Sequence, residues 1–185
     1  GDAAPALPEP VPLKKAKRQH IEMPSQQTFV LLGELGMSRT DPDYFPLLVA
    51  NEILGGSGFG SLLTRELREK RGLTYTVSSQ FVLMRTPGPF QISFATRADQ
   101  ADAALKLTQQ LLADFVQKGP DAAAVNNAIA QLTQAFPRSL MRSDAVASYL
   151  AMMGFYQLPA DYLSRYVEQL AAVTPAQVQS ALQRR

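Results

Sequence analysis

Two segments that alternate between apolar and polar residues, joined by a tight turn, constrain the fold of this chain most. In residues 73–85 and in residues 90–95, every second position carries mainly large apolar side chains. Thr86-Pro87-Gly88 lies between them and has the residue types of a turn. Because successive side chains of a strand point to opposite faces, alternation with a period of two indicates strands. The two segments therefore predict an antiparallel hairpin.

One more strand is expected before this hairpin, and only helices after it. Residues 28–36 form a short apolar run that ends at glycine, which is typical of a buried strand. Apolar residues at helical spacing predict helices over residues 42–55, 61–71, 99–118, 121–136, 144–156, 162–171 and 175–185. The boundary residues are the expected helix caps Thr40, Asp41, Ser61 and Asp99, and the expected helix ends at Gly72 and Pro137. This order predicts an α+β fold, an antiparallel β-sheet with helices packed over one face.

Length and composition indicate one globular domain behind a short leader. A chain of 185 residues is long enough for one well-buried core, and 46% hydrophobic with 18% charged residues excludes a disordered or fibrous protein. Residues 1–13 are rich in alanine and proline, so we expect a linker or an expression leader there and a single domain over residues 14–185. Because a spacer implies something on its far side, the chain is expected to be a fragment.

Charge and hydropathy exclude several functional classes. The net charge is only +2, and the dense basic cluster of residues 14–18 lies beside prolines in the leader. Nucleic-acid binding requires a basic face interleaved with aromatic residues on a folded element, and the sequence has none. No run approaches the ~20 apolar residues of a membrane-spanning helix, so no membrane span is expected. The absence of cysteine leaves the redox compartment open.

Metal and nucleophile chemistry within this chain are not expected either. A zinc peptidase needs two histidines one helical turn apart, and His20 is the single histidine. No G-x-S-x-G elbow supports a Ser-His-acid site. The glycine-rich residues 55–60 follow a predicted helix, whereas a dinucleotide-binding loop follows a strand, and they lack the lysine of a P-loop. We therefore expect no metal bound by this chain alone.

Two donors in the segment TRELREKRGLTY, residues 64–75, could act on a substrate. Arg68 has no carboxylate three or four positions away, so we expect its guanidinium to lack a local partner at the helix end. Tyr75 lies seven residues on, where a neutral phenol can donate a hydrogen bond. In one cleft, the two groups would bind substrate carbonyls and a developing oxyanion. The alternative is a surface arginine beside a half-buried tyrosine with structural roles only.

The segment LGGSGFGSLLTRELREKRGLTYTVSS, residues 54–79, resembles a signature of the pitrilysin/insulinase family of zinc peptidases, which includes the mitochondrial processing peptidases. The resemblance extends from about residue 23 to the C-terminus and implies the C-terminal half, which lacks zinc. Arg68 and Tyr75 match the family's arginine and tyrosine, which bind the substrate carbonyl and stabilise the tetrahedral intermediate. The family's substrate-binding loop matches glycines Gly55, Gly56, Gly58 and Gly60, with Phe59 as an inserted residue.

The resemblance also implies a partner and a cofactor. Zinc would be held by an H-x-x-E-H-bearing half, either fused to this chain or a separate subunit, and the two halves would close over an unfolded peptide. The isolated chain is therefore expected to be inactive, as one half of a zinc metalloendopeptidase. Some family members are structural core subunits, so the alternative is a non-catalytic assembly module. Bacterial family members suggest a periplasmic location, and the residues themselves do not fix the compartment.

Overall fold

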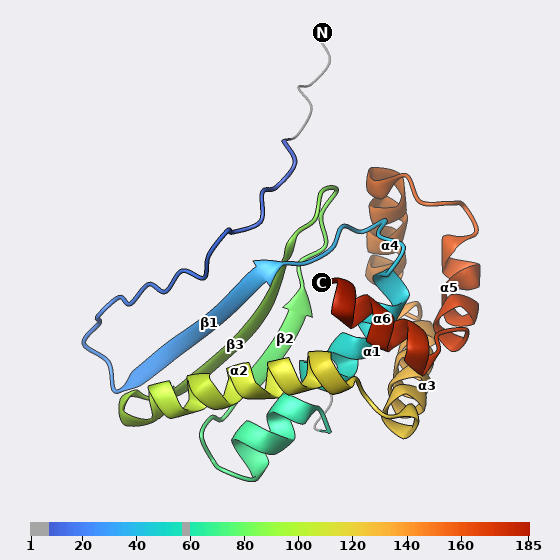
Figure 1. Ribbon diagram of the computed structural model, residues 1–185. Helices are drawn as coiled ribbons and strands as arrows, with labels where there is room; N and C mark the ends of the chain where they lie inside the picture. The colour runs from blue at the N-terminus through green and yellow to red at the C-terminus, as the bar shows by residue number, and fades with distance from the viewer. Residues whose placement is uncertain (1–7, 57–59) are drawn as a thin grey trace, which may run out of the picture.

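Three antiparallel strands form the sheet of this protein, and helices cover one of its faces (Figure 1). The computed structural model describes residues 8–56 and 60–185. The strands are β1 (Gln27–Leu35), β2 (Val77–Phe81) and β3 (Pro89–Arg97), in the order β1-β3-β2. Both neighbours run antiparallel to the central β3. The predicted α+β fold, with an antiparallel sheet and helices over one face, is confirmed.

The helices follow the order that the sequence predicts. They are α1 (Tyr44–Gly55), the π-helical η1 (Thr64–Glu69), the 3₁₀ turn η2 (Ala98–Gln100), α2 (Ala101–Lys118), α3 (Ala122–Ser139), α4 (Ser143–Tyr156), α5 (Tyr162–Ala171) and α6 (Pro175–Arg184). Helix α2 packs on β1 and β3, and α1 packs on β2, while α3 to α6 gather beside them (Figure 1). In the described residues, no helix has the length and apolar character that crossing a bilayer requires.

The buried core lies between the sheet and these helices. On β3, Phe90, Ile92 and Phe94 alternate with less buried residues and point into it. Burying such side chains stabilises the fold by about 1.5–3 kcal/mol each. On the other face of the sheet, Phe29 and Leu31 of β1 are exposed. The helices thus cover one side only.

Three local predictions were wrong. The strand expected over residues 73–85 is limited to β2, because hydroxyl contacts hold residues 73–76 in an irregular conformation. Asp99 does not cap α2, since its carboxylate pairs with Arg97. Pro137 does not break α3, which continues to Ser139. Because that proline lies in the last turn of the helix, it interrupts little of the backbone ladder that follows.

The cap predicted for α1 was also wrong. The helix begins at Tyr44 and not at Pro42, and neither Thr40 nor Asp41 caps it. Instead the Asp41 carboxylate accepts a hydrogen bond from the Asp43 backbone N–H at 2.9 Å, an Asx turn that precedes the helix.

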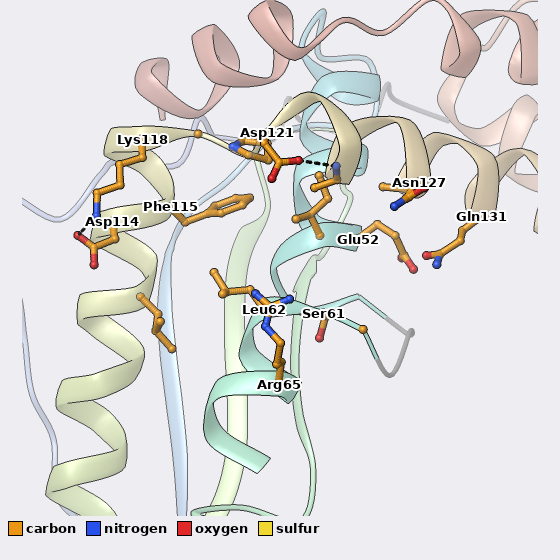
Figure 2. A pocket seen from close by; sticks show the side chains of 17 residues that line it. Glu52, Ser61, Leu62, Arg65, Asp114, Phe115, Lys118, Asp121, Asn127 and Gln131 are labelled. Carbon is orange, nitrogen blue, oxygen red and sulfur yellow. Dashed lines mark hydrogen bonds and ion pairs between the residues drawn. The ribbon is translucent and has the colours of Figure 1, made fainter. Parts of the chain in front are cut away.

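The ends of α1, α2 and α3 and the start of η1 surround a cavity of about 530 Å³ that opens to solvent (Figure 2). Phe115 and Leu62 form part of an apolar wall, while Arg65, Asn127 and Gln131 present polar groups. The carboxylate of Asp121 is occupied with capping α3, where it accepts from the Ala124 N–H at 2.7 Å.

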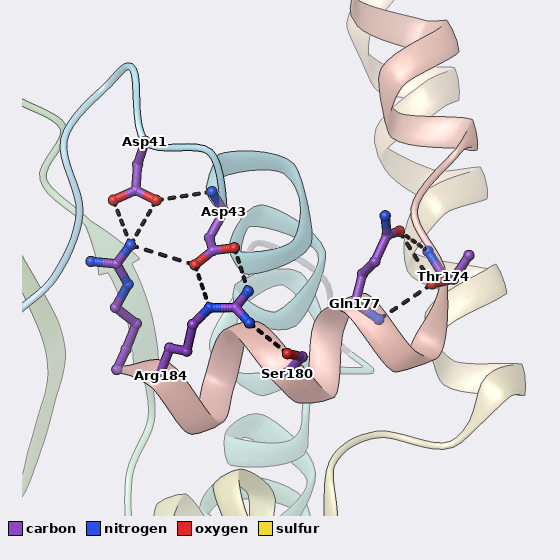
Figure 3. Close-up of polar contacts among 7 residues, drawn as sticks. Asp41, Asp43, Thr174, Gln177, Ser180 and Arg184 are labelled. Atoms are coloured by element: carbon purple, nitrogen blue, oxygen red, sulfur yellow. Dashed lines mark hydrogen bonds and ion pairs between the residues drawn. The ribbon is translucent and has the colours of Figure 1, made fainter.

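Ion pairs fasten the end of α6 to the loop before α1 (Figure 3). The Arg184 guanidinium donates to both oxygens of Asp43, at 3.1 Å and 2.6 Å. Arg185 donates to Asp41 at 2.6 Å and 2.7 Å. The hydrogen bond from Arg184 is the main reason why the pKa of Asp43 lies below its ordinary value. We name these four residues the Asp–Arg clamp.

We expect Asp43→Asn to lower the free energy of unfolding by about 1 kcal/mol at pH 7, the upper end for exposed ion pairs, because the bidentate contact is lost. Since the folded-state pKa of Asp43 is depressed, its contribution is complete above the unfolded value of about 3.9 and is lost as the pH falls through the folded value. Urea unfolding at pH 7 and pH 2.5 measures this.

Asp144→Asn is the matched control for the clamp, because its partner Arg142 and Asp144 itself are largely exposed. We expect a change within about 0.5 kcal/mol for that variant. If Asp43→Asn cost the same at both pH values, its effect would not come from the ion pair.

Candidate functional site

The segment that carries the candidate site is a wide, π-helical turn. In η1 the Lys70 N–H donates to the Arg65 carbonyl, five residues back, at 3.0 Å. Before it, the Ser61 hydroxyl accepts from the Thr64 N–H at 3.4 Å, so the predicted cap is confirmed. After it, Gly72 adopts a φ of +59° and its N–H donates to the Arg68 carbonyl at 3.0 Å. The predicted helix end at Gly72 is therefore also confirmed, and π-helical turns are frequent at functional sites.

Ion pairs on the exposed face of η1 surround one carboxylate. Glu66 accepts from Lys70 at 2.7 Å and from Arg71 at 2.8 Å. These contacts, that of Lys70 first, lower the pKa of Glu66 to about 2. Lys70 lies four residues after Glu66, the spacing of an ion pair on one helix face, and Arg65 lies 3.6 Å from Glu66. Four cations against two carboxylates leave residues 64–71 with a net positive charge.

Arg68 and Tyr75 lie side by side. The Arg68 guanidinium carbon is 5.2 Å from the centroid of the Tyr75 ring, within the range of a cation–π interaction. Tyr75 is 80% exposed. The expectation of an unpartnered guanidinium was wrong, because the Tyr75 ring, seven residues on, is one of its partners. The phenol is not buried, and the two groups share one surface at the start of β2.

The pair combines an exposed side chain, that of Tyr75, with a partly buried one, that of Arg68. The cavity in Figure 2 is lined by Arg65 of the same segment, but not by Arg68 or Tyr75. A second, largely apolar cavity also excludes both residues.

The glycines of the predicted substrate-binding loop differ in what surrounds them. A Cβ at Gly55 would lie 2.6 Å from the Ser79 Oγ and 2.8 Å from the Ser79 N, so glycine allows α1 to approach β2 closely. A Cβ at Gly56 would collide with Glu52, whereas one at Gly60 would meet nothing within 4 Å. Gly58 lies outside the described residues. Contact of this loop with substrate stays a prediction.

The described residues do not fit a zinc site. They contain no group of three or more His, Cys, Asp or Glu side chains that could hold a metal ion. His20 is exposed in the extended segment that precedes β1. Chemistry that requires a metal therefore needs ligands from outside the described part of the chain.

Comparison with known proteins identifies the family. Residues 1–132 match the family described as the peptidase M16 inactive domain. The chain belongs to the peptidase M16 family, as one of its inactive domains. A crystal structure of a peptidase M16 inactive domain from Pseudomonas fluorescens is similar over 100% of this chain and 43% of its own, at 40% identity and a TM-score of 0.91.

Further relatives of this M16 domain are zinc-protease-like proteins. An uncharacterized zinc protease of Streptomyces coelicolor is 28% identical over 156 residues, which is 84% of this chain and 34% of that protein. The M16 domain thus spans about a third of the length of the curated relatives it matches. A chain of complex III from Candida albicans has the same fold, with 16% identity, a TM-score of 0.76, and coverage of 88% of this chain and 41% of its own.

Proposed function

We propose that this M16 inactive domain is one half of a zinc endopeptidase and lends Arg68 and Tyr75 to an active site whose zinc is held by a partner half. The contact between the guanidinium and the exposed ring is the observation that carries this proposal. The exposed phenol of Tyr75 and the partly buried guanidinium of Arg68 lie together beside a segment with a net positive charge. Such a surface suits the carbonyl oxygens of a peptide held between two halves.

The chemistry follows from the two side chains. Arginine carries five N–H donors on a planar group and stays charged, and tyrosine offers a neutral O–H donor. Because the guanidinium lies over the face of the Tyr75 ring, the hydroxyl at the edge of the ring can still donate to a ligand. When a peptide bond is attacked, its carbonyl oxygen becomes an oxyanion, and each preorganised donor stabilises this state by about 2.7–4 kcal/mol.

The rest of the reaction belongs to the partner half. The described residues provide no metal cluster, so the partner would supply the zinc, the general base and the attacking water. The relatives named as zinc proteases are more than twice as long as this chain, which leaves room for such a half in the same polypeptide. An unfolded peptide is the substrate class that fits donors for backbone carbonyls.

The alternative, an assembly module without catalysis, has weaker support. The similarity to a complex III chain shows a shared fold alone at 16% identity. The contact of Arg68 with the exposed Tyr75 has no evident use in an assembly module, since an exposed tyrosine contributes little to the stability of its own domain.

Arg68→Lys in the full-length protein tests the proposal. Lysine keeps the positive charge but loses the planar fork, so we expect kcat/KM for a fluorescence-quenched peptide to fall by about 10²-fold. Arg71→Lys is the matched control, because Arg71 lies three residues on and pairs with Glu66 at the surface. Equal activity of the two variants would remove Arg68 from the site and favour the assembly module.

A further inference from the structure

The segment between η1 and β2 has no regular secondary structure, yet it carries Tyr75. Residues 73–76 link the helix end to the strand, and Tyr75 lies at their middle with its side chain 80% exposed. An exposed side chain on an irregular segment loses conformational freedom when it binds, which weakens binding and catalysis. To act as a preorganised donor, Tyr75 therefore needs a backbone that contacts with the rest of the domain hold in place.

Two buried hydroxyls fix this backbone to the central strand. The Thr74 hydroxyl lies 2.6 Å from the Ala95 carbonyl of β3 and 2.6 Å from the Thr76 carbonyl, and its one proton serves either of them. In the second contact the strand supplies the hydroxyl: Thr96 of β3 donates to the Leu73 carbonyl at 2.5 Å. Thr74 and Thr96 are 7% and 4% exposed. Leu73 and Thr74, the two residues before Tyr75, are thus tied to the sheet.

Thr96 is unusual in its place on the strand. The side chains that share its face of β3 are the core residues Phe90, Ile92 and Phe94. A hydroxyl at a core position is costly unless it is hydrogen-bonded, and here its partner is the carbonyl of the linker. Valine would fill the same volume without the hydrogen bond.

The backbone of Arg68, the other residue of the pair, is fixed by hydrogen bonds at the start of the same linker. The Leu73 N–H donates to the Leu67 carbonyl at 2.8 Å, and the Gly72 N–H donates to the Arg68 carbonyl at 3.0 Å. Leu67 itself is fully buried. The backbone of Arg68 and the start of the linker are therefore one hydrogen-bonded unit, which the Thr96 hydroxyl connects to β3.

We infer that Thr74 and Thr96 are positioning residues, which hold the phenol of Tyr75 against the guanidinium of Arg68 and so keep the two donors in register with a peptide carbonyl. The expected effect on catalysis rests on the proposed function, whereas the expected effect on the position of Tyr75 does not. Neither threonine touches the substrate; both act through Tyr75.

The test uses Thr74→Val, Thr96→Val and the corresponding serine variants in the full-length protein. Because a misplacement of about 1 Å can cost about 10²-fold in rate, we expect each valine variant to lower kcat by about 10–10²-fold. We expect KM to change little and serine to restore most of the rate, because serine keeps the hydroxyl. Thr108→Val is the matched control: Thr108 is fully buried, and its hydroxyl donates to the Ala104 carbonyl of its own helix, at 2.8 Å.

A second readout does not depend on activity. In protein with ¹⁵N-labelled arginine, the Tyr75 ring shifts the Arg68 Nε–H resonance, and Tyr75→Leu gives the value without the ring. We expect the valine variants to move this resonance toward that value, while the serine and Thr108→Val variants leave it in place. Circular dichroism confirms that each variant is folded. If one valine variant does not fold, the valine variant of the other threonine still decides the result.

The outcomes separate the two proposals. A shifted resonance in the valine variants, with wild-type rates for Tyr75→Phe, supports the positioning role and contradicts the catalytic one. An unchanged resonance and unchanged kcat in folded valine variants overturn the positioning role, whatever Tyr75→Phe does. Loss of activity that serine fails to restore would assign the threonines to packing alone and also overturn it.

Discussion

Tyr75→Phe in the full-length protein is expected to lower kcat by about 10²–10³-fold, the usual effect of removing one oxyanion donor. Phenylalanine keeps the ring and its contact with the Arg68 guanidinium, so only the hydroxyl is lost. The side chain is 80% exposed, and removing its hydroxyl leaves no buried partner unsatisfied. Stability should therefore change by less than about 0.5 kcal/mol.

The measurement is steady-state cleavage of a fluorescence-quenched peptide, with kcat and KM determined separately. A donor that acts only in the transition state lowers kcat and kcat/KM equally and leaves KM unchanged. A larger KM with an unchanged kcat would make Tyr75 a substrate-binding residue without a role in the transition state. Wild-type values for both constants would remove it from the site.

Gly88→Ala is expected to lower the free energy of unfolding by about 3 kcal/mol, from overpacking and from strained hydrogen bonds. A Cβ at this position would lie 1.8 Å from the Val82 carbonyl oxygen, which is backbone and cannot turn away. The Gly88 N–H donates to the Met37 carbonyl at 3.1 Å, and its carbonyl accepts from the Gly36 N–H at 2.8 Å. The methyl group would thus push apart the turn of the hairpin and the end of β1.

Thermal unfolding checks this, with an expected decrease in Tm of about 6–12 °C for a domain of this size. Gly60→Ala is the matched control, because a Cβ there meets nothing within 4 Å. If both variants had the wild-type Tm, the hairpin would not be packed as the structure shows.

Much of the helical half could be predicted from sequence because its ends carry their own signals. The range predicted for α5 matches Tyr162–Ala171, and α6 starts at Pro175 behind a capping box formed by Thr174 and Gln177 (Figure 3). In such helices the boundary is fixed by residues within one turn of it, so local chemistry decides it. For these helices, the spacing of the apolar residues and the capping residues predicted the same boundaries.

The strand predicted over residues 73–85 shows where local patterns are insufficient. Alternation continues from Tyr75 to Leu83, yet only β2 is a strand. What ends the regular structure on the N-terminal side is a contact with Thr96, more than twenty residues away in sequence. The sequence signal for this contact was a threonine among the phenylalanine and isoleucine residues of β3. Because β-branched residues are common in strands, that threonine did not indicate a contact with the linker.

The candidate site was likewise only partly readable from the residues. Charge spacing identified Arg68 as lacking a local carboxylate, but a rule that compares positions three and four apart cannot detect a ring at position 75. The role assigned to the pair came from resemblance to a family. Gly55 was assigned to a loop, and the structure explains this glycine by the close approach of α1 to Ser79.

The binding of a tetrahedral phosphinic peptide to wild-type and Tyr75→Phe protein tests the central claim most directly, because such a compound mimics the transition state of peptide hydrolysis. If Arg68 and Tyr75 stabilise that state, the substitution weakens binding of the phosphinic peptide by the same factor as it lowers kcat/KM, about 10²–10³-fold. Equal affinity of both proteins for the phosphinic peptide would contradict the claim.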